Sequence, residues 1–402
     1  MTFATVARAE PPLGGQRLVA LLGGAVLLGG AFMLGAQGWR YGALFLIGAL
    51  LGMSLYHAAF GFTAAYRNAL LERDVSGVAA QVVMLGLAML LFAPVLASGQ
   101  AFGRPVGGAL APAGMQVAIG SFLFGLGMQL GGGCGSGTLY TVGGGSARMV
   151  VTLIAFCAGA FIGSLDMARY ASLPSLGSIS LARELGFGNA IAVQLVVLLL
   201  IWLALRLYAR GAPQQPIWGE GLSWWRLLHG PWPLLFSATM LAVLNFATLL
   251  VAGHPWTVTW AFTLWGAKTA ALLGWDPASS PFWAGGFPGA ALARTIFRDN
   301  ISIMDLGIVL GALLAAALAG RFSPTWKVPP RSLLAAILGG LLMGYGARLA
   351  FGCNIGAFFS GVASFSLHGW LWIACALPGT WLGVRLRPLF GLANRAPAVR
   401  RL

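Results

Sequence analysis

The sequence predicts an all-α polytopic membrane protein with about ten transmembrane helices, short re-entrant helices and internal, inverted repeats. Hydrophobic residues make up 58% of the 402 residues and charged residues only 8%, whereas a soluble domain has roughly 25% charged residues. Apolar segments of spanning length recur along the chain, and a glycine-rich cysteine turn occurs twice. The net charge of +15 does not indicate nucleic-acid binding, because the arginines are scattered between apolar segments as in membrane-protein loops.

Eleven apolar segments have spanning or near-spanning length, which requires about 20 residues for a helix that crosses the bilayer. Glycine and proline interrupt them often, as is usual where small residues let membrane helices pack closely. The segments are residues 16–36, 41–56, 76–98, 114–131, 148–166, 188–209, 233–252, 256–274, 301–320, 333–350 and 366–384.

Shorter glycine-rich stretches follow several of these segments and are expected to be re-entrant. They are too broken to cross, and irregular backbone at membrane depth persists only where protein buries it or where it lines a cavity. The candidates are residues 57–66, 131–147, 282–290 and 351–365.

An internal repeat is indicated by the stretches Gly125–Arg148 and Gly344–Phe365. A shift of 219 positions superposes Cys134 on Cys353 together with flanking glycines. The stretch His57–Arg67 follows its own apolar segment in the same way and is interpreted as a third, diverged copy.

A weaker fourth copy is expected at 235–274, followed by Trp283–Gly289. The chain is then a single integral membrane domain of two pseudo-repeat halves, about 1–209 and 233–402, joined by the polar loop 210–232.

The arginine distribution predicts that both termini are cytoplasmic. Arg8 and Arg17 favour a cytoplasmic N-terminus, but eleven crossings would place the C-terminal arginines outside, against the positive-inside rule. If 256–274, which Lys268 interrupts, is re-entrant, ten crossings remain and both ends lie inside. The C-terminal arginines are Arg385, Arg387, Arg395, Arg400 and Arg401.

The cysteine turns have the chemistry of a small oxyanion site. A glycine-rich turn that opens a half-helix presents unpaired N–H groups and the positive end of a dipole, while the thiol is a soft, polarizable weak donor that suits a terminal sulfur. Nearby N–H dipoles could instead make the thiol a nucleophile, and the residues do not decide between these roles. The candidate path residues are Cys134, Cys353, Gly133, Gly135, Ser136, Gly137, Thr138, Gly352, Asn354 and Gly356.

Three further polar residues are candidate accessory groups: Arg348, Lys268 and His57. Lys268 inside an apolar segment suggests function, with snorkelling or a structural ion pair as the alternative. The histidines lack paired metal-ligand spacing, so neither a metal nor another cofactor is expected. Cys157 and Cys375 are interpreted as packing residues.

The motifs GGGCGSGTLYTVGGG and RLAFGCNIGAFFSGVASFSLHGWLW resemble the paired motifs of the YeeE/YedE family, also called the sulfur-transport domain family. The stretches HAAFGFTAAYR and PWTVTWAFTLWGAKTAALLGWDP resemble it as well, so the similarity covers about residues 41 to 385. The resemblance implies an hourglass-shaped bacterial inner-membrane protein that takes up thiosulfate along a line of cysteines. It also implies a small cytoplasmic sulfur carrier of the TusA type as a partner.

The resemblance assigns Cys134 and Cys353 to two relay cysteines, but the position of a third is occupied by Gly61. A shorter relay, another group such as Cys157, Cys375 or His57, or a different substrate would account for this departure.

The sequence therefore predicts a transporter, not an enzyme, for thiosulfate or a related sulfur or selenium anion. The alternative is a membrane sulfurtransferase in which a cysteine persulfide passes sulfur to a carrier. A membrane scaffold without sulfur chemistry is a third reading. The expected partners are that anion, the carrier and the lipid bilayer, and no nucleic acid is expected.

Overall fold

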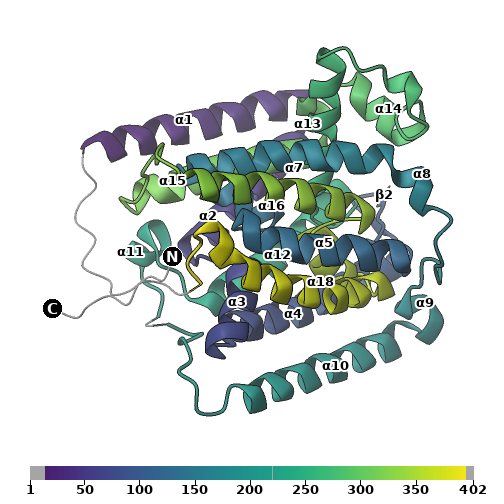
Figure 1. Cartoon of the computed structure of the whole chain (residues 1–402), viewed down its shortest axis with the longest axis horizontal. Coiled ribbons are helices and arrows are strands. Elements are labelled where there is room, and N and C mark those ends of the chain that lie inside the picture. The colour runs from purple at the N-terminus through teal and green to yellow at the C-terminus, as the bar shows by residue number, and fades with distance from the viewer. Residues whose placement is uncertain (1–13, 220, 395–402) are drawn as a thin grey trace.

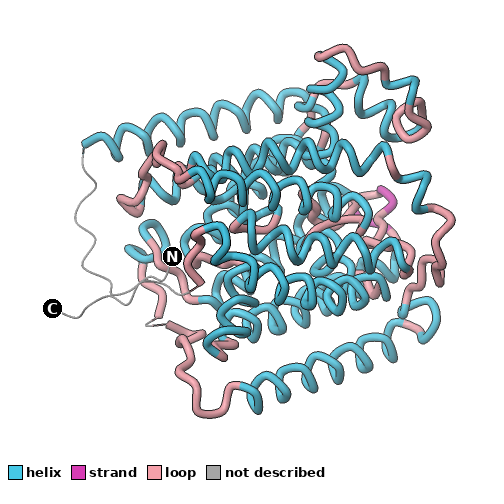
Figure 2. Tube along the Cα trace, in the orientation of Figure 1, coloured by secondary structure: helices cyan, strands magenta, loops and turns pink. Residues whose placement is uncertain are grey.

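The computed structural model describes residues 14–219 and 221–394, and the regular secondary structure of this part of the chain is almost entirely helical. The long helices lie side by side, and most loops gather at the two ends of the bundle (Figure 1, Figure 2). Within the described residues, nine stretches are long and apolar enough to cross a membrane. The predicted all-α polytopic membrane protein is confirmed.

Ten long helices coincide with ten of the eleven predicted segments. One of them, α18, has 20 residues and so the length to cross, but Trp, Gly and Pro dilute its apolar side chains and it is not among the nine. The long helices are α1 (Gly14–Gln37), α2 (Trp39–His57), α4 (Ser76–Ser98), α5 (Met115–Gly131), α7 (Ala147–Leu165), α10 (Phe187–Tyr208), α12 (Leu234–Ala252), α15 (Asn300–Leu318), α16 (Pro330–Leu349) and α18 (Leu367–Leu386).

Short helices follow four of the long ones after a tight turn. They are α3 (Phe62–Glu72) after α2, α6 (Gly135–Gly143) after α5, α13 (Thr259–Leu272) after α12, and η3 (Asn354–Phe359) with α17 (Ser360–Ala363) after α16. The structure thus contains all four copies of the unit. The eleventh predicted segment is α13, whose 14 residues extend only about 21 Å, less than the thickness of the bilayer core.

The prediction that 282–290 is re-entrant is wrong. Those residues lead into α14 (Gly286–Ala293), which has no buried residue and projects from one end of the bundle (Figure 1). Only Trp283 beside it is fully buried. The glycines and apolar residues of 282–290 resembled a membrane turn, but the short helix that follows α12 is α13.

The remaining elements are small and lie in the connections. They are the hairpin β1 (Gln100–Ala101) and β2 (Arg104–Pro105), the helices α8 (Met167–Tyr170), α9 (Leu181–Leu185) and α11 (Trp224–His229), and the turns η1 (Pro277–Ser279), η2 (Ile296–Arg298) and η4 (Arg387–Phe390).

The glycines shared by the two cysteine stretches are helix-crossing residues. A Cβ added at Gly127 would lie 2.8 Å from the Gly339 carbonyl oxygen, and one added at Gly120 would lie 2.6 Å from that of Gly346. One residue number rises as the other falls, so α5 and α16 are antiparallel. In the internal repeat Gly120 corresponds to Gly339, and Gly127 corresponds to Gly346. If the two copies are swapped, the contact between Gly120 and Gly346 becomes the contact between Gly339 and Gly127, which is the other contact observed. The two cysteine units are therefore inverted copies related by an approximate two-fold axis.

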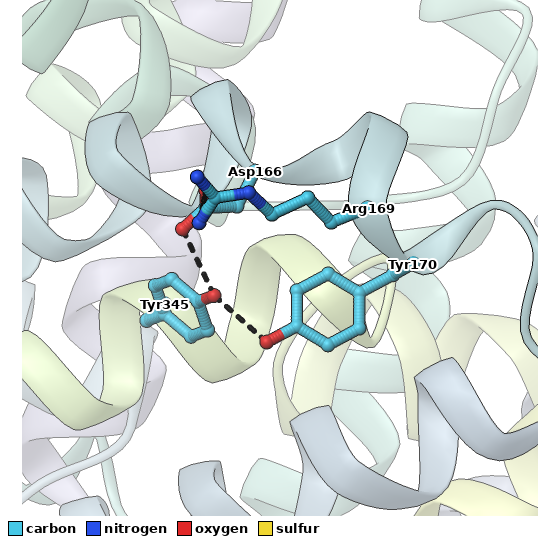
Figure 3. A network of polar contacts seen from close by, with 4 residues as sticks. All are labelled: Asp166, Arg169, Tyr170 and Tyr345. Carbon is cyan, nitrogen blue, oxygen red and sulfur yellow. Dashed lines mark hydrogen bonds and ion pairs between the residues drawn. The ribbon is translucent and has the colours of Figure 1, made fainter.

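A polar network ties the end of α7 to α16 (Figure 3). The Tyr345 hydroxyl donates to Asp166 at 3.1 Å and lies 2.9 Å from the Tyr170 hydroxyl. Asp166 also pairs with Arg169 at 2.9 Å. This network fixes the connection after α7 on the same long helix that leads to Cys353.

The start of α1 and the end of α18 lie at the same end of the bundle (Figure 1). This arrangement agrees with an even number of crossings, as the arginine distribution predicted. Arg8, Arg395, Arg400 and Arg401 lie outside the described residues. That this end faces the cytoplasm stays a prediction.

Candidate functional site

Cys134 stands at the N-terminus of α6, where α5 has just ended. Gly132 adopts a φ of +95°, a left-handed conformation that glycine permits and that lets the chain reverse. The sulfur lies 3.5 Å from the Ser136 hydroxyl and close to the N–H groups of Ser136 and Gly137. Thr138 donates its hydroxyl to the Cys134 carbonyl at 2.8 Å, which closes the turn. The first N–H groups of α6 are therefore directed at the thiol.

Cys353 has the same place in the inverted copy, at the N-terminus of η3. Gly352 has a φ of +150°, and the Cys353 sulfur accepts a hydrogen bond from the Ile355 N–H at 3.4 Å. A Cβ added at Gly352 would lie 2.7 Å from the N–H nitrogen of Ala357. In the first copy a Cβ at Gly133 would lie 3.1 Å from that of Thr138, the equivalent residue. Gly133 and Gly352 are thus required for the same close turn.

The two cysteine turns meet. A Cβ added at Gly135 would lie 3.2 Å from the Cys353 sulfur, so Cys353 rests against the backbone beside Cys134. The same added Cβ would lie 3.4 Å from Val258, the residue at the N-terminus of α13. Cys134 and Cys353 are fully buried and belong to one core cluster. Three of the four short helices therefore begin at the same point of the core.

Gly61 lies apart from this point, at the N-terminus of α3. A Cβ added there would lie 3.3 Å from the hydroxyl of Tyr140, which belongs to α6. Gly61 therefore stands beside the helix that Cys134 begins, with a phenol hydroxyl in the direction that a side chain would take.

Two buried side chains at the cysteine turns have polar atoms without a hydrogen-bond partner. They are the hydroxyl of Tyr66 and both amide atoms of Asn354. Tyr66 lies within interaction range of Asn354 and Cys134. The sequence identified Asn354 but missed Tyr66, which lies five residues beyond Gly61 on α3 and reaches the cysteines only through the fold. A buried unpaired donor costs stability unless a ligand or water satisfies it.

The remaining path residue, Gly356, has its N–H beside the Cys353 sulfur and its Cα against the turn before α13. A Cβ added there would lie 2.6 Å from the Thr257 hydroxyl oxygen. The second turn therefore leaves no room for a side chain at this position.

In the structure the three accessory residues contact groups other than the thiols. Lys268 donates to the carbonyls of Leu292 and Arg294 at 2.7 and 2.6 Å, where it binds the C-terminal end of α14. Arg348 lies over the ring of Phe282, with 5.0 Å from its guanidinium carbon to the ring centroid.

His57 is buried at the end of α2. Its ring centroid lies 5.2 Å from that of Trp232, and its Nε2 atom has no hydrogen-bond partner. All four cysteines are free, and Cys157 and Cys375 are half-buried on α7 and α18 rather than in turns.

Two cavities lie toward opposite ends of the bundle from this centre. The arginine cavity, about 730 Å³, has Arg40, Arg104, Arg294 and Arg298 in its wall and reaches Phe351 and Gly356 of the second cysteine turn. The Gly61 cavity, about 420 Å³, has Ala58–Gly61, Asp74, Arg226 and Trp232 in its wall. The elements around the first cavity, β2 and α14, lie at one end of the bundle, and α3 and α11 lie at the other (Figure 1). The buried thiols therefore separate two openings.

The sequence matches the sulphur-transport family over residues 57–382, a span that contains every candidate path residue. The chain belongs to the sulphur-transport family. Both cysteine turns and Gly61 fall inside the family match.

Relatives in this family differ in how much of the chain they match. The thiosulfate transporter TsuA of Spirochaeta thermophila is 30% identical over 347 residues, which cover 84% of this chain and 96% of TsuA. TsuA of Escherichia coli K12 is 23% identical over 355 residues, 84% of this chain and 91% of that protein. The probable transporter YedE of Escherichia coli K12 is 33% identical over 178 residues, 42% of this chain and 43% of YedE. The match thus spans less than half of YedE but nearly all of TsuA.

Proposed function

We propose that this protein takes up thiosulfate, or a closely related sulfur or selenium anion, across the bacterial inner membrane. The observation that carries the proposal is the meeting of Cys134 and Cys353 between two cavities that open at opposite ends of the bundle. The printed function of the TsuA relatives, thiosulfate transport, supports the choice of anion.

The two ends of thiosulfate differ, and the site offers different groups to each. The terminal sulfur is soft and matches the thiols of Cys134 and Cys353 as weak hydrogen-bond donors. The sulfonate oxygens match the N–H groups at the start of α6 and the unpaired donors of Tyr66 and Asn354. Sulfate has no soft end, so the thiols would favour thiosulfate over it.

A sulfurtransferase remains the alternative, in which one thiol takes the sulfane sulfur as a persulfide and sulfite leaves. Burial of both thiols disfavours it, because a carrier protein cannot reach Cys134 or Cys353 without opening the core. Intact mass spectrometry after thiosulfate exposure separates the two. An added sulfur on either cysteine during turnover would favour the sulfurtransferase, and unmodified thiols favour hydrogen-bonded passage.

If both termini are cytoplasmic, as the arginine distribution predicts, the Gly61 cavity opens on the cytoplasmic side. A TusA-like sulfur carrier would then collect the anion or its sulfur at the Gly61 cavity. Co-purification of such a carrier with the full chain tests this partner, and a variant of the Gly61-cavity wall such as Arg226→Glu should weaken it.

The function is tested by thiosulfate-dependent growth of a sulfate-uptake-deficient bacterium that expresses the chain. Cys134→Ala and Cys353→Ala should each abolish growth, while Cys375→Ala, a matched change on α18 away from the turns, should leave it unchanged. Growth that both turn variants support as well as the wild type would contradict passage between the thiols.

The variant Gly61→Cys tests whether a third thiol on the proposed path increases the rate of thiosulfate uptake. The new Cβ would lie 3.3 Å from the Tyr140 hydroxyl, so a small shift of that side chain accommodates it. Faster growth than the wild type would mean that the passage from α6 to the Gly61 cavity limits the rate.

A further inference from the structure

Asp305 is a buried carboxyl group that the proposed passage does not use. It is the sixth residue of α15, it is fully buried, and neither of its carboxyl oxygens has a hydrogen-bond partner. The other acidic side chains in the described chain lie at helix ends, in short surface helices or in loops: Glu72, Asp74, Asp166, Glu184, Asp276 and Asp299. Within those residues Asp305 is therefore the one acidic side chain well inside a spanning helix.

A charged and unpaired carboxylate at this position would be costly, because nothing replaces the water that it loses. Such a group is retained inside a membrane protein mainly where it serves an ion or proton pathway. A neutral carboxylic acid carries a much smaller penalty. The carboxyl is therefore expected to hold a proton for at least part of any cycle.

The helix register places Asp305 between the arginine cavity and α6. Residues four apart share a helix face, and the neighbours of Asp305 on that face are Ile301 and Val309. Ile301 lines the arginine cavity, and the Val309 carbonyl packs against Gly143 at the end of α6. The carboxyl also lies within electrostatic range of the Cys353 and Cys157 thiols.

Among the residues that the structure describes, no cationic side chain pairs with the Asp305 carboxyl. Its ionisable neighbours are the thiols of Cys353 and Cys157 and, at the start of its own helix, Asp299. At its contacts with α2, α6, α1 and α13 the facing residues are uncharged: Gly48, Gly52, Gly143, Gly23 and Trp265, which donates to Ser302 at 3.0 Å. Two further elements that pack against α15 carry basic residues, Arg298 on η2 and Arg226 and His229 on α11.

The nearest candidate cation on α13 has other partners. Lys268 donates to the carbonyls of Leu292 and Arg294, as described above. Because no cation of the described chain pairs with the Asp305 carboxyl, a bound proton is the simplest way to neutralise it.

We propose that Asp305 carries a proton through the membrane with the anion, so that uptake is proton-coupled symport. The inference rests on the proposed function. Asp305 accepts a proton from the arginine-cavity side, which removes a negative charge next to Cys353 before a dianion arrives. After the anion leaves toward the Gly61 cavity, the carboxyl releases the proton to that side. Only the O–H bond of the carboxyl forms and breaks, and one proton enters with each anion.

The full chain reconstituted in liposomes with a trapped pH-sensitive dye tests the coupling. Labelled thiosulfate reports uptake, and the dye reports protons. Thiosulfate should acidify the lumen of wild-type vesicles, and Asp305→Asn should reduce the protons carried per anion at least tenfold. Asp276→Asn, the same change at an exposed carboxylate, should behave as the wild type. Thiosulfate uptake without acidification, or equal acidification by Asp305→Asn, would overturn the proposal.

Infrared difference spectroscopy gives a readout that does not depend on transport. The spectrum of the wild type minus that of Asp305→Asn at neutral pH should contain the C=O band of a protonated, weakly hydrogen-bonded carboxyl. Absence of the band would refute the proton-carrying role even if the vesicles take up thiosulfate. Presence of the band in a protein that moves no thiosulfate would instead reject thiosulfate as the anion and keep Asp305 as a protonated group.

Discussion

At the scale of single residues, the site depends on glycines whose missing side chains leave space for close contacts. Gly135 lets the Cys353 sulfur rest on the backbone next to Cys134, and Gly133 and Gly352 allow the two turns to close. The polar groups nearby are neutral: Tyr66, Asn354 and Ser136. Neutral donors bind an anion without the strong attraction of a salt bridge, so they allow the anion to leave again.

Gly135→Ala should stop passage while the fold persists. The added methyl group would lie 3.2 Å from the Cys353 sulfur and 3.4 Å from Val258, tighter than ordinary contact. Overpacking of this kind costs about 1–3 kcal/mol, and we expect thiosulfate uptake to fall by about tenfold or more, measured with labelled anion in vesicles. Gly86→Ala on α4 is the control, because its methyl group would lie 3.7 Å from the nearest atom. Full uptake by Gly135→Ala would place the path elsewhere.

Tyr66→Phe should weaken anion binding without destabilising the protein. The variant removes a buried hydroxyl that lies beside Asn354 without a well-formed hydrogen bond, so the free energy of unfolding should change little. A hydrogen bond to a charged group contributes about 1.5–3 kcal/mol, so the KM for thiosulfate should rise by about tenfold or more. Tyr170→Phe, which removes a hydroxyl bonded to Tyr345, is the control and should leave the KM unchanged. A Tyr66→Phe protein with an unaltered KM would remove Tyr66 from the site.

At the scale of elements, the inverted copies make the site from the ends of short helices. The antiparallel crossing of α5 and α16 sets the depth at which α6 and η3 begin. Because the crossing uses equivalent glycines on both helices, the two thiols reach the same point from opposite directions.

The pseudo-symmetry predicts matched losses of stability. Gly127→Ala and its equivalent Gly346→Ala each insert a methyl group against the backbone of the facing helix. Each should lower the thermal unfolding midpoint in detergent, with a cost of about 1–3 kcal/mol, and the two losses should be similar. Gly29→Ala on α1 has no neighbour within 4 Å and should not lower it. Unequal losses would show that the two halves of the crossing are not equivalent in the protein.

At the scale of the whole molecule, charge is concentrated on one opening. Among the described residues, the arginine cavity has four arginines in its wall against one carboxylate, Asp299, whereas the Gly61 cavity has one arginine and one aspartate. A funnel of one sign raises the local concentration of anions and their rate of arrival. The asymmetry therefore favours entry of anions through the arginine cavity.

Charge removal at the arginine cavity should lower the uptake rate in a salt-dependent manner. Arg294 and Arg298 are exposed, so a double change to Gln should reduce initial uptake several-fold at low ionic strength. At about 1 M salt, where the Debye length is about 3 Å, screening should make the initial uptake rates of the wild type and the double variant equal. Initial rates across a salt series measure this. A double variant with the wild-type rate and salt dependence would refute electrostatic recruitment by these arginines.

The sequence by itself determined the membrane class, the positions of ten long helices and the paired cysteine turns. Those features are encoded by residues that are neighbours in the sequence. A run of about 20 apolar residues has the length and hydrophobicity of a helix that spans the bilayer, and the Gly-Gly-Cys turn consists of consecutive residues. It also indicated the inversion of the copies and the short α13, since Lys268 and the arginines limit which segments cross.

Only the tertiary structure decided which distant residues meet. Lys268 and Arg348 resembled site residues because a charge in an apolar segment suggests function, yet one binds the end of α14 and the other lies over Phe282. No sequence motif marks Tyr66 on α3 as a site residue, but packing of the four short helices brings it beside Asn354. Asp305 likewise became a candidate only from the structure, in which neither of its carboxyl oxygens has a hydrogen-bond partner. Contacts between residues far apart in sequence depend on how the helices cross, and apolar periodicity does not specify that.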